Sequence, residues 1–321
     1  MNLIKKVAAT FGLLVLASAS LTSCSATPAD TSKPTIVATT NVWANVAEQI
    51  AGDNFVVTAL ITDPAQDPHS FEASARDQLA VSESSIFIIN GGGYDEFAEV
   101  LATAAKVVPF NVYELHEGEH GAEHSEEYTE EGDHSEEHTE EGDHSGEDEH
   151  AHDGSDHTWY DLHVAELTAE LLAAKMSELQ PENAEESAAN AQSFAADIAA
   201  LEERISAFGV NLSYFEAHPL ATLLFNELGF TNLTPEGFAE AEEAGLEPSV
   251  KIMSDATALI EQKKISFLAV NRQVTSASLE KLKTLAEENG IAVLTFDELL
   301  AEGQSYQDWF AALLTELEAT R

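Results

Sequence analysis

Three histidines lie where the sequence predicts that a structural element begins, and their side chains could bind one metal ion together. His69 follows a strand-like run, His157 opens the segment 157–161, and His218 precedes a helix-like run. Imidazole nitrogen suits Zn(II), and three imidazoles with one carboxylate fill a four-coordinate site. The carboxylate candidates, Asp297 and Glu298, follow the last predicted strand. A lone histidine beside a turn is more often a cap or a surface group, so the hypothesis depends on all three together.

A site closed by four protein ligands favours binding over catalysis. It leaves no position for an activated water, and outside the acidic segment 114–156 the sequence has no His-Glu-x-x-His pair of the kind that metallopeptidases use. We therefore expect no enzyme activity, with an exported zinc-dependent enzyme as the alternative from another class. His163, six residues after His157, is not expected to bind the metal.

The segments between these residues alternate between strand-like and helix-like patterns. Strand patterns at 35–40, 55–61, 85–90, 265–270 and 291–296 alternate with helical patterns at 42–50, 77–81, 94–105, 220–228, 248–263, 278–288 and 306–319. This order predicts an α/β protein of two lobes, 34–183 and 210–321, each a small, mainly parallel sheet with covering helices. One long rigid helix at 184–209 is expected to bridge them. Ligands of open α/β sheets bind beyond the carboxyl ends of the strands, where the three histidines occur.

Residues 114–156 have a different composition from the rest of the chain. They include nineteen Asp or Glu, eight His and no Lys or Arg, and a decapeptide beginning at His124 is repeated at His134. Without apolar periodicity, this segment is predicted to be a disordered surface loop. Its histidines are expected to bind metal weakly and to raise the local metal concentration, the alternative being a dispensable spacer. They are His116, His120, His124, His134, His138, His144, His150 and His152.

The N-terminus has the features of a lipoprotein signal peptide, residues 1–23. Two lysines precede a short apolar run, which ends in Leu21-Thr22-Ser23-Cys24. Cys24 is the only cysteine, and we expect it to be lipidated, followed by a tether at 24–33; an ordinary secretory signal is the alternative. These features predict an extracytoplasmic protein anchored to the cell membrane. The net charge of -44 argues against nucleic acid as a partner.

Taken together, the motifs resemble those of the zinc/manganese family of ABC-transporter solute-binding proteins. The resemblance covers essentially the whole mature chain, with Leu162 as a departure where the family usually has proline. The segment 67–72 resembles the first ligand motif, 90–95 a turn after a strand, and 157–161 the second ligand motif. His218-Pro219-Leu220 matches the third ligand position, Asn271-Arg272-Gln273 resembles an Asn-x-Gln turn, and 291–309 resembles the last strand, acidic ligand and ending.

This resemblance implies a receptor that binds Zn(II) in a cleft between the lobes and delivers it to an ABC permease. It implies His69, His157, His218 and Glu298 as ligands, with Asp297 as the alternate because one residue of slippage exchanges the two. A monomer is expected. A Mn(II) receptor of the same family, or a surface zinc metallochaperone or adhesin without a transporter, is the alternative. Histidine at 218 and the His-rich loop favour zinc, since manganese prefers oxygen ligands.

Overall fold

The computed structural model describes residues 33–64, 66, 68–116, 156–243 and 245–321. The predicted signal peptide, Cys24 and most of the tether lie outside these residues. So do seven of the eight loop histidines, His116 being the exception. In the described part of the chain, no helix combines the length and the apolar character needed to cross a membrane.

The first sheet has four parallel strands, and the side chains of its central strands alternate between two cores. Strands β1 (Thr35–Thr40), β2 (Val56–Ile61), β3 (Ile86–Ile89) and β4 (Phe110–Asn111) lie in the order β2-β1-β3-β4. Ile36 and Ile88 pack into the core that contains α1 (Asn41–Ala51). Val37 and Phe87 point to the opposite face, towards α2 (Ala75–Glu83) and α3 (Glu96–Ala105). This two-residue alternation is the expected behaviour of a sheet covered on both faces.

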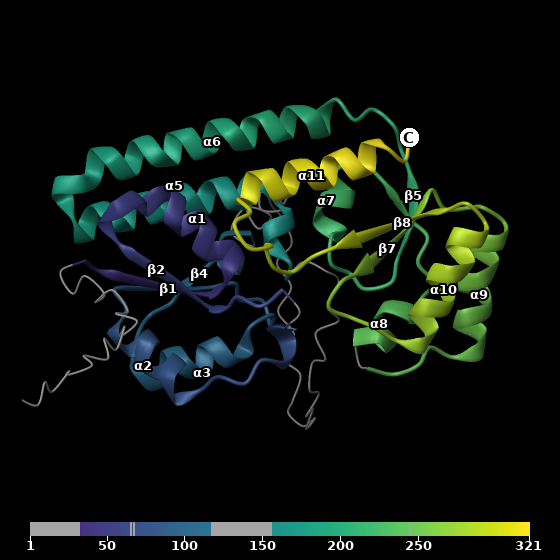
Figure 1. The fold of residues 1–321 in the computed structure, drawn as a ribbon, viewed down its shortest axis with the longest axis horizontal. Coiled ribbons are helices and arrows are strands. Elements are labelled where there is room, and N and C mark those ends of the chain that lie inside the picture. Colours follow the sequence, from purple (N-terminus) through teal and green to yellow (C-terminus); the bar gives the residue numbers. More distant parts are fainter. Residues whose placement is uncertain (1–32, 65, 67, 117–155, 244) are drawn as a thin grey trace, which may run out of the picture. The chain divides into compact units, whose positions relative to one another are not determined.

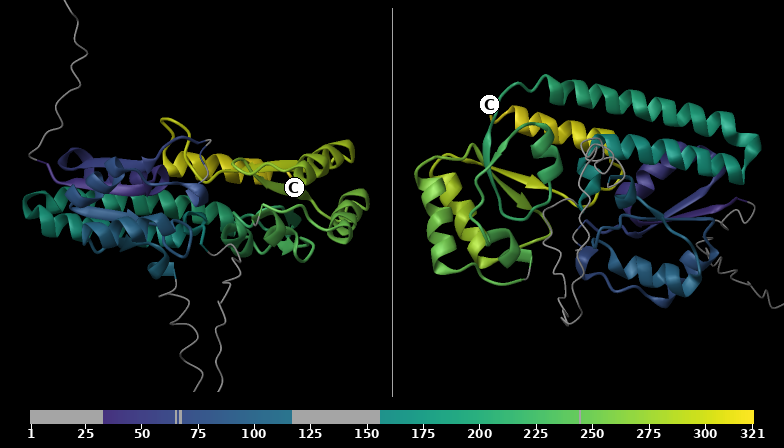
Figure 2. Two further views of the ribbon diagram at one scale, coloured as in Figure 1. Left: turned by 90° about the horizontal axis from the view of Figure 1, so that it is seen from below. Right: turned by 180° about the vertical axis from the view of Figure 1, so that it is seen from behind.

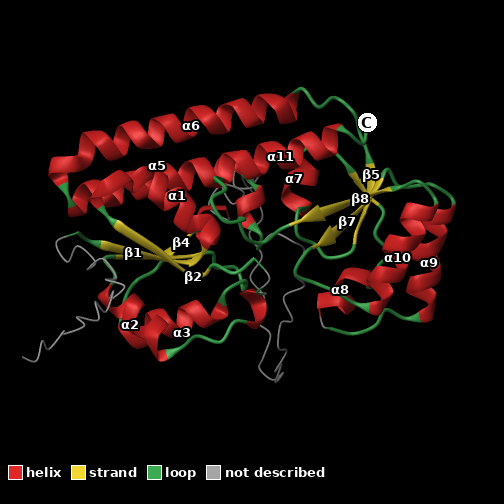
Figure 3. Cartoon of the chain, viewed as in Figure 1, coloured by secondary structure: helices red, strands yellow, loops and turns green. Residues whose placement is uncertain are grey.

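The second sheet repeats this arrangement. Strands β5 (Ser213–Glu216), β6 (Thr231–Asn232), β7 (Phe267–Asn271) and β8 (Ala292–Phe296) are parallel in the order β6-β5-β7-β8. Helices α7 (Thr222–Glu227) and α11 (Tyr306–Glu318) lie on one side of this sheet. Helices α8 (Phe238–Glu243), α9 (Val250–Glu261) and α10 (Ala277–Glu288) lie on the other (Figure 3). The two parallel sheets with their helices confirm the predicted α/β class.

Two long antiparallel helices pack against each other beside the sheets. Helix α5 (Leu162–Leu179) and the 23-residue α6 (Ala184–Ser206) pack along each other, and α6 continues past α11 (Figures 1 and 2). An apolar stripe on α6 is buried and consists of Phe194, Ile198, Leu201 and Ile205. These side chains join one large core that contains residues of both sheets. Helix α6 therefore connects the two sheets in two ways: its buried side chains pack in the core that they share, and its backbone lies between them in the sequence.

The arrowheads of both sheets point towards the region between them (Figure 3). The loops that leave the carboxyl ends of the strands therefore face one another across this region. The sequence patterns did not identify β4, β5, β6 or α8, all of which are short. Of these, β5 matters most for function, because it leads directly into His218.

Candidate metal centre

The side chains of His69, His157 and His218 meet between the two sheets. The ring centroids lie 5.7 Å apart for His69 and His157, 6.3 Å for His69 and His218, and 5.9 Å for His157 and His218. One nitrogen from each ring lies within 4.8 Å of the others. Zinc–nitrogen bonds of about 2.0–2.1 Å in a tetrahedron require donor atoms about 3.3 Å apart. The nitrogens thus need to move closer by at most about 1.5 Å to bind one ion.

His69 forms the open side of this group. It lies in a short 3-10 helix, Pro68–Ser70, in the loop that follows β2, and it is exposed whereas the other two are buried. The Tyr94 ring packs edge-on against it, with centroids 4.8 Å apart. A metal ion from solvent can therefore reach the site from the His69 side.

His157 is buried beside a carboxylate. Its Nδ1 lies 3.1 Å from Asp156 Oδ1, which leaves Nε2 as the atom available to a metal. Burial lowers the pKa of His157, but the charges of Asp156, Glu298 and Glu216 more than compensate and raise it to about 9. A proton must therefore leave His157 before metal can bind near neutral pH.

Asn90 fixes the segment that carries His157. It follows β3, and its side-chain amide donates to the Asp156 carbonyl at 2.6 Å. Its side-chain oxygen accepts from Thr158 Oγ1 at 2.7 Å and from Trp43 Nε1 at 3.1 Å. Because Asn90 is fully buried, these bonds tie the His157 segment to the first sheet.

His218 is positioned by Glu216 at the end of β5. The Glu216 carboxylate accepts from the backbone N–H groups of Leu220 and Ala221, at 3.0 and 2.7 Å, and from Thr222 Oγ1 at 2.7 Å. These bonds close the loop around His218. Burial raises the pKa of Glu216 to about 7, although its hydrogen bonds act in the opposite direction.

Glu298 lies in the buried interior next to the histidines, while Asp297 does not. Tyr94 Oη donates to Glu298 Oε2 at 3.0 Å, and Asn271 Nδ2 donates to Glu298 Oε1 at 2.6 Å. The residue is 1% exposed, and its carboxylate is one of the charges that act on His157. Both oxygens are thus held, one by Tyr94 in the loop that follows β3 and one by Asn271 at the end of β7.

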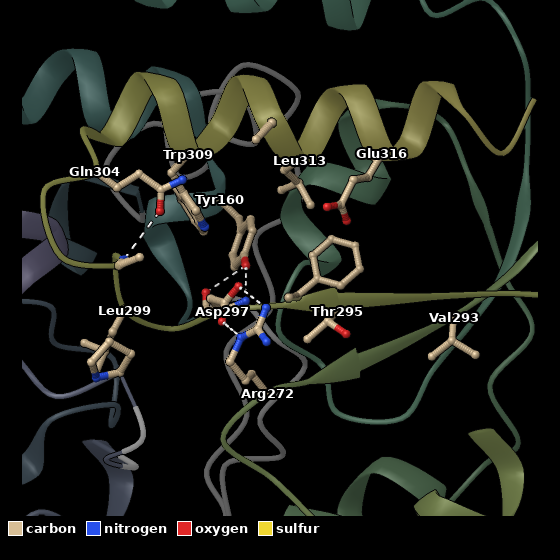
Figure 4. Close-up of a pocket in the computed structure, with 14 residues that line it drawn as sticks. Tyr160, Arg272, Val293, Thr295, Asp297, Leu299, Gln304, Trp309, Leu313 and Glu316 are labelled. Atoms are coloured by element: carbon tan, nitrogen blue, oxygen red, sulfur yellow. Dashed lines mark hydrogen bonds and ion pairs between the residues drawn. The ribbon is translucent and has the colours of Figure 1, made fainter. Parts of the chain in front are cut away.

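Asp297 instead faces a separate surface pocket of about 550 Å³. There its carboxylate pairs with Arg272, while the Tyr160 hydroxyl donates to the Asp297 carbonyl at 2.8 Å (Figure 4). A carboxylate already paired with a guanidinium is a poor candidate for a metal ligand. Of the two adjacent acids, Glu298 therefore has the more suitable environment.

The remaining histidines in the described chain lie elsewhere. His163 does not join the three histidines; its ring lies near Glu166 and Glu202. His116 pairs with Asp161, with Nδ1 and Oδ2 3.3 Å apart.

The sequence patterns did not predict the role of the residues that position the site, although two of these residues lie in the motifs 90–95 and 271–273. The positioning residues are Tyr94, Asp156, Glu216 and Asn271, which hold or surround the candidate ligands. A usable signal existed for two of them, because Asp156 directly precedes His157 and Glu216 ends an apolar run two residues before His218.

Comparisons with known proteins agree with the fold and the resemblance. The family model described as "Zinc-uptake complex component A periplasmic" matches residues 36–320. The structure of the periplasmic zinc-binding protein TroA from Treponema pallidum has a TM-score of 0.65 and 16% sequence identity. It covers 90% of this chain and 97% of TroA, which shows a shared fold.

Curated relatives are similar over part of their length. The metal ABC transporter substrate-binding lipoprotein ScbA of Streptococcus cristatus is 27% identical over 200 residues, 60% of this chain and 57% of ScbA. The manganese-binding lipoprotein MntA of Halalkalibacterium halodurans is 27% identical over 206 residues, 63% of this chain and 59% of MntA. The matched region thus spans somewhat more than half of either relative. The family match over residues 36–320 shows that this chain belongs to the zinc-uptake component A family, the substrate-binding proteins of metal ABC transporters.

Proposed function

We propose that this protein is an extracytoplasmic receptor that captures Zn(II) between its two sheets and delivers it to an ABC importer. The observation that carries the proposal is the convergence of His69, His157 and His218 from three distant parts of the chain. Three imidazoles within 4.8 Å are a donor set for a divalent transition metal. Family membership supports transport as the purpose of binding.

Zinc is favoured over manganese by the donor set. Three neutral imidazole nitrogens and one carboxylate suit Zn(II), whereas Mn(II) prefers sites richer in oxygen. Mn(II) remains the second candidate, since one relative is named as a manganese-binding lipoprotein. Glu298 is the proposed acidic partner. Each of its oxygens accepts one hydrogen bond and keeps a lone pair, so Glu298 can act as a ligand or as an outer-shell charge with both bonds in place.

The residues suggest an order of events in capture. The ion first meets the exposed His69, and it then displaces the proton on the buried His157. His218 completes the group from the second half of the chain. Lipidation of Cys24 would keep the loaded receptor near the permease.

Competitive zinc titration of the full chain against a chromophoric chelator tests this proposal. His69→Ala and His218→Ala should each lose at least 100-fold in zinc affinity, because each removes one of three nitrogen donors. Asp297→Asn serves as the matched control and should bind zinc as the parent does. Near-parental affinity in both histidine variants would refute the site. Tighter binding of Mn(II) than of Zn(II) by the parent would refute the metal assignment.

A further inference from the structure

A second group of metal-binding side chains lies between α5 and α6. His163 and Glu166 are three residues apart on α5 and therefore share one face of that helix. Glu202 reaches them from the last turns of α6, which lie beside the first turns of α5 in the antiparallel pair. One ligand atom from each of the three lies within 4.8 Å of the others. The group thus presents one imidazole nitrogen and two carboxylate oxygens to a common point.

The charges around this point are mainly negative. Burial raises the pKa of Glu202, and the charge of Glu166 raises it further. Glu227 on α7 has its pKa raised to about 7, first by burial and then by Asp161 and Glu202. The charge of His163 acts in the opposite direction and lowers the pKa of both Glu202 and Glu227. A bound divalent cation would offset this repulsion.

From this geometry, we propose that His163, Glu166 and Glu202 form a second, weaker binding site for a divalent transition metal such as Zn(II). Two helices supply the ligands, and a pair spaced i and i+3 on one helix is a recurrent way for helical proteins to build such sites. The site has only three protein ligands, and His163 is exposed, so water completes the coordination. Both features make it weaker than the three-histidine site.

The second site is separate from the first. Asp161 lies between them in the chain, and its carboxylate is already used: Oδ1 caps α5 by accepting from the backbone N–H groups of His163 and Val164 at 3.0 and 3.2 Å. Its other oxygen pairs with His116. The two groups share no ligand residue, so each site can be removed by mutation without changing the ligands of the other.

Zinc stoichiometry of the full chain tests the inference. The parent, His163→Ala and Glu166→Gln are equilibrated with the same excess of zinc, and bound zinc is measured by elemental analysis. Each variant should bind about one ion fewer than the parent. Glu170→Gln, one helical turn further along α5, is the matched control and should bind as many ions as the parent. The acidic segment is present in all four proteins, so its contribution cancels.

A second readout follows from the position of the site between two helices. After one equivalent of zinc has filled the tighter site, further zinc should raise the melting temperature of the parent more than that of His163→Ala. Equal stoichiometry together with equal zinc-dependent shifts in the parent and His163→Ala would overturn the inference. His69→Ala should lose the tight ion and keep the second, so the two proposals fail separately.

Discussion

The protonation of His157 gives the sharpest consequence of the site geometry. Burial lowers its pKa, but Asp156, through its charge and contact, and then Glu298 and Glu216 raise it to about 9. At pH 7.5, a group with this pKa is about 97% protonated, so binding of the first zinc ion should release nearly one proton from His157. Asp156→Asn preserves the side-chain size and removes the charge. Burial then dominates, and the pKa of His157 should fall.

The size of the effect follows from the two pKa values. If the variant returns His157 to the ordinary pKa of about 6.5, only about 9% of it is protonated at pH 7.5. The first zinc ion should then release about 0.9 proton fewer from the variant than from the parent. Asp297→Asn removes a carboxylate that is paired with Arg272 instead and should release the parental number of protons.

Isothermal calorimetry at pH 7.5 in buffers of different ionisation enthalpy measures this number directly. The slope of the observed binding enthalpy against buffer enthalpy gives the protons released by the first equivalent of zinc. An equal slope for the parent and Asp156→Asn would refute the reasoning that Asp156 keeps His157 charged before metal binds.

Three further predictions follow from the same contacts. Glu298→Gln should weaken zinc binding by about 10- to 100-fold whether Glu298 is a ligand or an outer-shell charge; a chelator competition that finds parental affinity would exclude both roles. Glu216→Ala should lower zinc affinity and also destabilise the protein by about 1–3 kcal/mol, because three donors lose their acceptor; urea unfolding that matches the parent would contradict this. The metal-free protein should lose stability as pH rises, because both raised pKa values favour the protonated folded state. The loss due to Glu216 should occur between about pH 4.5 and 7, and the loss due to His157, about 3 kcal/mol of unfolding free energy, between about pH 6.5 and 9. An unfolding free energy that is independent of pH from 5 to 9 would speak against this.

The class of fold was predictable because its signals are local. Strongly apolar runs such as Ile86–Ile89 and the stripe that begins at Phe194 are visible in the sequence, and both are buried as expected. Strand β5 was missed because it is only four residues long and ends in a glutamate, which ordinarily indicates a surface position. Here the glutamate is buried because loop donors satisfy it.

The candidate ligands could be proposed from the sequence, whereas the role of a supporting residue such as Tyr94 could not. A histidine beside a proline or an aromatic run stands out by type, so His69, His157 and His218 could be proposed from sequence. Tyr94 could not, because its contact with Glu298 spans 204 residues of chain and depends on how the two sheets face each other. The choice between Asp297 and Glu298 was likewise open, since one residue of register places a side chain in the interior or beside Arg272.

A crystal structure of the full chain with one equivalent of zinc, with data collected at the zinc absorption edge, is the most direct test of the receptor proposal. We expect one strong anomalous peak about 2.0–2.1 Å from a nitrogen of each of His69, His157 and His218. A peak that lies elsewhere, with these three side chains directed to different places, would contradict it.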